Sequence, residues 1–222
     1  MDILGFEKLI YHRDKLDSLA RNKPQFPIHA TVSLGNYCNH KCLWCTAYEY
    51  QLDKARMIDF DSLLNWLTRA RDRGLKAIGY VGNGEPTTYP RFAELVHAVN
   101  GLGLQQGMFT NAYLLDRYEQ EVLDCFTYIR VSLDAGSADM HARMHDVRPA
   151  HYPKIMDNLT SLVAKREAGT PTIGIQYATH HQNLSDLYEA AREAAEIGVD
   201  YLSVKPVFNR GSVGERIEKN QL

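Results

Sequence analysis

The chain has 222 residues, of which 45% are hydrophobic and 23% charged, the composition of an ordinary globular protein. Its formal net charge of −2 gives no basic footprint for nucleic acid or for an acidic membrane surface. No stretch approaches the roughly 18 consecutive apolar residues that a membrane-spanning helix requires. We therefore expect a globular protein with no nucleic-acid partner and no membrane partner.

The N-terminal residues and the cysteines indicate the compartment. Charged residues such as Asp2, Glu7 and Lys8 come too early for the apolar region of a secretory signal. Three of the four cysteines are clustered, which is typical of metal ligands in a reducing compartment and not of a disulfide framework. These features predict a cytoplasmic location.

Residues 1–26 are predicted to form an N-terminal helix and a connector into the first strand. The apolar stripe of this helix consists of Phe6, Leu9, Ile10, Leu16 and Leu19. At the other end, the polar segment 207–222 is expected to be the beginning of a missing or mobile segment. Residues 27–206 between them form the main domain.

Six short apolar, β-branched runs alternate with helical patterns along this domain. The runs are Ile28–Leu34, Ala77–Val81, Leu104–Thr110, Tyr128–Leu133, Thr172–Ala178 and Tyr201–Val204. Repeated strand–helix–strand units predict parallel pairing with right-handed crossovers. Six strands are too few for a closed eight-stranded barrel of about 250 residues. We therefore predict an α/β fold, a partial (β/α)6 TIM barrel with a parallel six-stranded sheet and an N-terminal helix.

The helix boundaries carry recognisable signals. Asp59 or Asp61 is a plausible N-cap for the helix after the first strand. Gly74, Gly169 and Gly198 follow three of the predicted helices, where a left-handed C′ residue is favoured.

The cysteines Cys38, Cys42 and Cys45 follow the first predicted strand with the spacing C-x3-C-x2-C. A cubane iron–sulfur cluster normally takes four thiolates. Three thiolates leave one iron with an open position, where a substrate or cosubstrate binds. The remaining Cys125 lies in an apolar helical pattern and is expected to be a buried core thiol.

Polar residues follow the other predicted strands at their carboxyl ends, where parallel α/β folds carry their active sites. Gly-rich backbone after the second strand permits close approach to a ligand. The residues at these ends are Gly82, Asn83, Gly84, Glu85, Thr110, Asn111, Ser132, Asp134, Gln176, His180 and Lys205.

Four motifs follow one another at the ends of the first four predicted strands. They are the three cysteines, the Gly-x-Gly-Glu turn at Gly82–Glu85, the pair Thr110 and Asn111, and the Val-Ser-Leu-Asp run at Val131–Asp134. With these motifs in this order, the chain resembles the radical S-adenosylmethionine superfamily. Within it, the chain is similar to the branch that contains the molybdenum-cofactor cyclase and the SPASM- and twitch-type enzymes. The similarity extends from about Pro27 to Pro206. Asn83 stands where the commoner motif has glycine.

The resemblance implies a 4Fe–4S cluster on Cys38, Cys42 and Cys45, and S-adenosylmethionine bound at the open iron. The implied cofactor-binding residues are Trp44 near the adenine, Gly82, Asn83, Gly84 and Glu85 at the methionine ammonium, Ser132 and Asp134 at the ribose or methionine, Arg143 at the carboxylate, and Thr110, Asn111 and Gln176. The stretch Ile173–Ile175 resembles the apolar strip that meets adenine.

The resemblance also implies an activity. S-Adenosylmethionine is cleaved reductively to a 5′-deoxyadenosyl radical, which abstracts hydrogen from a small-molecule, sugar or peptide substrate. A reductase such as flavodoxin or ferredoxin supplies the electron. Lys205, His180 and Tyr48 are the candidate catalytic residues. Dehydrogenation, epimerisation, bond formation and methyl transfer all stay open.

Two other functions are compatible with the residues. A zinc-stabilised α/β binding module would use the triad with His40 or Cys125 as fourth ligand, although structural zinc usually takes two separated ligand pairs. On balance we expect His40 to be a solvated loop residue. A glycyl-radical activase would require a surface for docking a partner protein.

Several site residues also have structural interpretations. In these alternatives, His180 and His181 are a solvated pair in a loop, and Tyr48 serves in packing. Lys205 would form a structural ion pair instead of contacting the substrate or cosubstrate, and Arg143 would be a surface residue of its helix.

Overall fold

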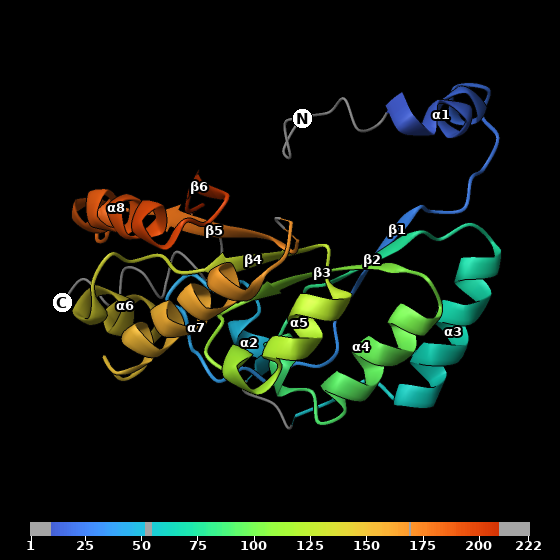
Figure 1. Cartoon of the computed structure of the whole chain (residues 1–222). Helices are drawn as coiled ribbons and strands as arrows, with labels where there is room; N and C mark the ends of the chain where they lie inside the picture. The colour runs from blue at the N-terminus through green and yellow to red at the C-terminus, as the bar shows by residue number, and fades with distance from the viewer. Residues whose placement is uncertain (1–9, 52–54, 169, 209–222) are drawn as a thin grey trace.

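The computed structural model describes residues 10–51, 55–168 and 170–208 (Figure 1). Six parallel strands form one sheet in the order β1-β2-β3-β4-β5-β6, so β1 and β6 are its open edges. The strands are β1 (His29–Val32), β2 (Ala77–Tyr80), β3 (Gln105–Thr110), β4 (Tyr128–Ser132), β5 (Thr172–Thr179) and β6 (Tyr201–Pro206). The predicted α/β partial barrel is confirmed.

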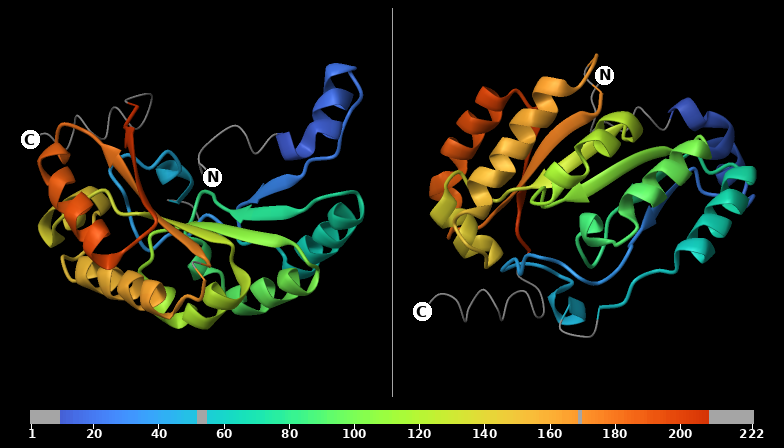
Figure 2. Two further views of the ribbon diagram at one scale, coloured as in Figure 1. Left: turned by 45° about the horizontal axis from the view of Figure 1, so that its top comes forward. Right: turned by 60° about the horizontal axis from the view of Figure 1, so that its bottom comes forward.

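Helices connect successive strands and cover the convex face of the curved sheet (Figures 1 and 2). The helices are α1 (Arg13–Ala20), α2 (Tyr48–Gln51), α3 (Phe60–Asp72), α4 (Phe92–Gly101), α5 (Glu119–Cys125), α6 (Ala138–His145), α7 (His151–Lys165) and α8 (Leu187–Ile197). Because the crossover helices lie on one face, the other face of the sheet is left for the site.

The helix ends follow the predicted signals. Asp59 caps α3, because its Oδ1 accepts the backbone N–H of Ser62 at 2.9 Å. Gly74 and Gly198 have φ angles of 107° and 82°, in the left-handed region expected of C′ glycines. Gly169 lies outside the described residues.

The N-terminal helix α1 stands away from the sheet (Figure 2). Leu16 and Leu19 of its predicted apolar stripe are exposed, and Phe6 and Leu9 lie outside the described residues. Most of the predicted tail, over 209–222, also lies outside them. Within the described ranges, no helix has the length and apolarity needed to cross a membrane.

Aromatic side chains lie on the concave face of the sheet near the amino ends of β4 and β6. Tyr128 and Tyr201 begin β4 and β6, and their rings lie over glycines of the neighbouring strands. A Cβ atom at Gly107 would come within 2.1 Å of the Tyr128 ring, and one at Gly174 within 2.0 Å of the Tyr201 ring. Arg130 donates to the Tyr201 hydroxyl at 3.1 Å. These side chains thus occupy the concave face near the amino ends of β4 and β6.

The main core lies between the sheet and the helices. Phe92 of α4 is fully buried, and its ring centroid lies 4.9 Å from that of Tyr118 and 6.0 Å from that of Tyr80. The burial of such rings supplies apolar contact area that fixes α4 against the sheet. Cys125 is buried in the same core, as predicted.

We expect Phe92→Ala to lower the free energy of unfolding by about 3–5 kcal/mol, because it leaves a cavity in this core. Tyr188→Ala is the control, since Tyr188 is 75% exposed on α8 and its removal changes stability by less than about 0.5 kcal/mol. Urea denaturation followed by circular dichroism measures both. Equal losses in the two variants would contradict the assignment of this core.

Candidate active site

A cavity of about 350 Å³ lies at the carboxyl ends of the strands. Most of the predicted metal and cofactor residues line it, and they come from the ends of β1 to β5. They are Cys38, Cys42, Cys45, Trp44, Gly82, Asn83, Gly84, Glu85, Thr110, Asn111, Ser132, Asp134 and Gln176. Residues that are far apart in the sequence therefore surround one cavity in the structure.

The predicted catalytic candidates are not part of this lining. Lys205 is exposed on β6, and Tyr48 is half-buried at the first position of α2. His180 is half-buried beside the cavity, with its ring centroid 6.2 Å from that of Trp44. Burial lowers the pKa of His180, and the neighbouring His181 lowers it further.

Arg143 also lies outside the lining. It is exposed on α6, and its Nη2 donates to the carbonyl oxygen of Gln182 at 2.9 Å. On β5, Ile173 and Ile175 are buried in the main core, so the strand presents Gln176 to the cavity instead of the predicted apolar strip. Alternation along a strand explains this difference, because successive side chains face opposite sides of the sheet.

The segment between β1 and α2 that carries Cys38, Cys42 and Cys45, here called the cysteine loop, has little regular structure and is held by its neighbours. On one side it pairs with the last turn of α6. The N–H of Lys41 donates to the carbonyl oxygen of His145 at 2.9 Å, and the N–H of Leu43 donates to that of Met144 at 2.8 Å. These bonds satisfy helix-terminal carbonyls that have no intrahelical partner.

On the other side the cysteine loop contacts the turns after β2 and β3. The N–H of Glu85 donates to the carbonyl oxygen of Tyr37 at 2.9 Å, and the amide of Asn111 donates to Asn39 Oδ1 at 2.7 Å. The approach is so close that a Cβ atom at Gly84 would lie 2.3 Å from the Tyr37 carbonyl oxygen. Glycine at this position is therefore a steric requirement.

The Glu85 carboxylate is a hydrogen-bond acceptor for two turns. Its Oε1 accepts from Thr110 Oγ1 at 2.6 Å and from Thr87 Oγ1 and N at 2.7 and 3.2 Å. Its Oε2 accepts the N–H of Asn111 at 2.8 Å. Burial raises the pKa of Glu85, and these hydrogen bonds oppose the shift. The carboxylate thus fixes the Gly-x-Gly-Glu turn against the end of β3.

Asp134 connects three elements of the site. Its Oδ1 accepts the N–H of Ala178 at 2.7 Å, and its Oδ2 accepts the indole N–H of Trp44 at 3.2 Å. The Nε2 of His145 lies 3.4 Å from the same Oδ2. The carboxylate therefore orients both the Trp44 ring and the His145 ring beside the cysteine loop.

Four histidines pack together behind the cysteine loop. The prediction that His40 is solvated is wrong, since only 1% of it is exposed. Its Nδ1 lies 3.2 Å from Nδ1 of His145, and its Nε2 lies 3.3 Å from Nδ1 of His151. His141 stacks on His145 with ring centroids 4.2 Å apart. The rings fill the space between the loop, α6 and the beginning of α7.

The surroundings change the basicity of these rings. Burial lowers the pKa of His40 to about 2, with His145 and His141 as further causes, and burial likewise lowers that of His141 to about 2. Burial alone lowers the pKa of His145, but the neighbouring Cys42 and Asp134 raise it to about 10. His145 is the basic member of the group.

His141, His145 and His151 are not among the predicted site residues. The spacing of His141 and His145 at i and i+4 places both on one face of a helix, and this was an available signal. Their contact with His40 joins residues more than 100 positions apart, which no local pattern reveals.

The donor set fits a metal cluster. Burial raises the pKa of the Cys38 thiol, and nearby Cys42 raises it further, so a bound metal would supply the positive charge that a thiolate needs there. A tetrahedral zinc ion at about 2.3 Å from each sulfur would draw thiolates to within roughly 4 Å of one another. In the part of the chain that the structure describes, the three cysteines do not form a group of ligand atoms within 4.8 Å. They line a shared cavity, as the ligands of a multi-iron cluster do.

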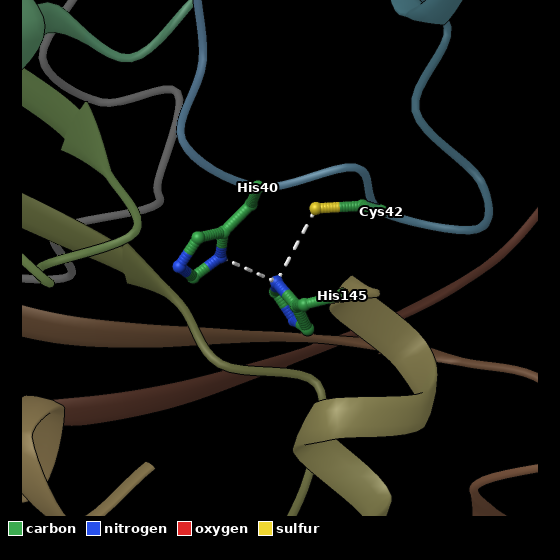
Figure 3. A group of neighbouring side chains, drawn as sticks. All are labelled: His40, Cys42 and His145. Atoms are coloured by element: carbon green, nitrogen blue, oxygen red, sulfur yellow. Dashed lines mark hydrogen bonds between the residues drawn. The ribbon is translucent and has the colours of Figure 1, made fainter. Parts of the chain in front are cut away.

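A different trio does converge. His40, Cys42 and His145 each offer one ligand atom, and these atoms lie within 4.8 Å of one another (Figure 3). The Sγ of Cys42 lies 3.2 Å from Nδ1 of His145.

The fold and the cavity together define a partial-barrel protein with a cysteine-lined site for a metal cluster. The family model of the Radical SAM superfamily matches residues 32–194. The chain belongs to this superfamily of enzymes, whose cofactors are a 4Fe–4S cluster and S-adenosylmethionine.

Two curated proteins are similar in sequence to a large part of this chain. A tungsten-containing aldehyde ferredoxin oxidoreductase cofactor-modifying protein from Pyrococcus furiosus is 31% identical over 182 residues, covering 78% of this chain and 49% of that protein. A PqqA peptide cyclase from Bradyrhizobium diazoefficiens is 25% identical over 186 residues, covering 82% and 47%. The chain thus spans about half the length of these curated relatives.

A solved structure shares the fold. Streptococcus suis SuiB, bound to the precursor peptide SuiA, superposes with a TM-score of 0.72 at 21% identity, over 94% of this chain and 46% of that chain. SuiB bound to S-adenosylmethionine gives the same TM-score at 19% identity, over 96% of this chain and 49% of that chain.

We expect Gly84→Ala to separate the cysteine loop from the turn after β2, because the added methyl group meets backbone atoms of Gly35 and Tyr37. The free energy of unfolding should fall by about 1–3 kcal/mol, and iron content after reconstitution should fall with it. Gly101→Ala on α4 is the control, since a Cβ atom there has no neighbour within 4 Å. Unchanged iron content in Gly84→Ala would contradict the steric role.

Proposed function

We propose that the chain is the catalytic domain of an enzyme that cleaves S-adenosylmethionine reductively and abstracts hydrogen from a peptide or small-molecule substrate. The observation that carries the proposal is the shared cavity. Cys38, Cys42 and Cys45 line the same space as Gly84 and Glu85. A cluster ligand set thus faces a turn suited to an amino acid headgroup.

The three cysteines hold the cluster, and their loop keeps them in position through its bonds to α6 and to the turns after β2 and β3. When bound, the reduced cluster supplies the electron that splits the sulfonium bond of S-adenosylmethionine and yields the 5′-deoxyadenosyl radical. The protein's own task is to bind, to orient and to exclude water.

The remaining lining residues receive the cosubstrate. The turn Gly82–Glu85 presents backbone carbonyls for the methionine ammonium, and the Glu85 carboxylate holds that turn in shape. Trp44 packs beside the adenine with its ring fixed by Asp134. Ser132 serves the ribose or the methionine. Arg143 is not retained in this set, because it is exposed and bonded to Gln182.

The substrate is proposed to be a peptide or another small molecule. The relative named as a PqqA peptide cyclase supports a peptide, and the relative named as a cofactor-modifying protein supports a smaller substrate. A reductase such as flavodoxin or ferredoxin supplies the electron. A glycyl-radical activase stays an alternative, which an assay for a protein radical distinguishes.

The test is product formation by anaerobically reconstituted protein with dithionite and S-adenosylmethionine. The native chain should form 5′-deoxyadenosine, and Cys45→Ala should not, because the cluster loses one of three thiolates. Cys125→Ala is the matched control, because Cys125 is buried in the core on α5. This substitution should leave the amount of product unchanged. Liquid chromatography with mass detection measures the product.

The zinc-stabilised binding module makes the opposite prediction. A colourless protein with stoichiometric zinc, no labile sulfide and no 5′-deoxyadenosine would overturn the proposed function.

A further inference from the structure

The last residue of α6 is in close contact with one of the three cysteines. The Nδ1 of His145 lies 3.2 Å from the Sγ of Cys42 (Figure 3). His145 is fully buried at the last position of α6. A side chain so enclosed keeps one orientation.

The partners of the ring determine which atom carries the proton. A cysteine that serves as a cluster ligand is a thiolate, which accepts hydrogen bonds and donates none. The proton between the two atoms therefore lies on Nδ1 of His145. The same N–H lies 3.2 Å from Nδ1 of His40, whose other nitrogen lies 3.3 Å from His151. On the far side of the ring, Nε2 faces the Asp134 carboxylate.

We propose that His145 is a positioning residue that donates an N–H···S hydrogen bond to Cys42 and thereby raises the reduction potential of the cluster. This inference rests on the proposed function, because it requires Cys42 to be a cluster ligand. Hydrogen bonds to the sulfurs are among the main controls of iron–sulfur potentials. The added electron increases negative charge on the sulfurs, so a donor stabilises the reduced state more than the oxidised state.

The backbone of His145 has a separate role, which makes the side chain testable. Its carbonyl oxygen accepts the N–H of Lys41, and that bond survives any substitution of the ring. Removal of the imidazole therefore leaves the docking of the cysteine loop on α6 in place. The hydrogen bond to Cys42 and the contact between Nε2 and Asp134 are then the contacts that change, and the first of them is the one that reaches a cysteine.

The same geometry has one competing interpretation. His40, Cys42 and His145 could hold a single ion, since both rings have a partner on their other nitrogen, as metal-bound histidines do. Such an ion would take Cys42 away from the cluster. The proposal and this alternative differ in the metal that the protein binds.

The experiment compares His145→Leu, His145→Asn and His141→Leu in the full chain after anaerobic reconstitution. Leucine removes the donor, and the asparagine amide places an N–H near the position of Nδ1. His141→Leu is the matched control, because His141 is equally buried on the same helix but has no hydrogen-bond partner. Iron and zinc content and the midpoint potential from an EPR-monitored titration are measured for each.

At the native midpoint, His145→Leu should lower the ratio of reduced to oxidised cluster about tenfold, which corresponds to about 59 mV for one electron. His145→Asn should restore most of the shift, and His141→Leu should show little of it. Equal shifts in both leucine variants, or no shift in His145→Leu, would overturn the inference while leaving the proposed function standing. If His145→Leu assembles no cluster, a native midpoint in His145→Asn supports the hydrogen bond, and a midpoint lowered by about 59 mV in His145→Asn overturns it.

Stoichiometric zinc in the native chain, lost in His145→Leu, would overturn the inference by assigning the trio to an ion. That outcome without iron or labile sulfide would also end the proposed function, so the two failures are distinguishable.

Discussion

The site depends on backbone hydrogen bonds that dock an irregular cysteine loop onto α6 and onto the turn after β2. An irregular loop satisfies only some of its own buried N–H and C=O groups, so its neighbours must satisfy others. Here the last turn of α6 accepts from Lys41 and Leu43, and Tyr37 accepts from the turn after β2. The cysteines hold their positions because these three contacts come from two different parts of the barrel, α6 and the turn after β2.

The site also requires hydrogen-bond partners for the buried carboxylates that line the cavity. An unpaired carboxylate in a protein interior is strongly unfavourable. Glu85 meets four donors, and Asp134 meets the N–H groups of Ala178 and Trp44. The same bonds that stabilise these carboxylates fix the turn and the indole ring that line the cavity. Stability and preorganisation thus have one origin, since a fully satisfied polar network is also rigid.

Much of the fold could be predicted because its signals are local. Short apolar, β-branched runs located all six strands, and the Asp59 cap and the C′ glycines at Gly74 and Gly198 agree with the structure. The strand ends also predicted most of the residues that meet at the cavity, although His180 and Lys205 do not line it. These predictions needed only the rule that parallel strands end at one edge of the sheet.

What the sequence did not reveal depends on helix rotation and distant contacts. Residues two apart on a helix point about 200° apart, so α6 directs His145 to the cavity and Arg143 to solvent. Only the packing of α6 against the cysteine loop decides which of them faces inward. His40 is buried for the same reason, since its neighbours His145 and His151 belong to a distant part of the chain.

Mössbauer spectroscopy of the 57Fe-reconstituted chain, with and without S-adenosylmethionine, shows whether Cys38, Cys42 and Cys45 hold a cluster whose one open iron binds the cosubstrate. We predict a 4Fe–4S spectrum in which the signal of a single iron changes when S-adenosylmethionine is added. A spectrum that does not respond to the cosubstrate, or a chain that binds no iron under these conditions, would contradict it.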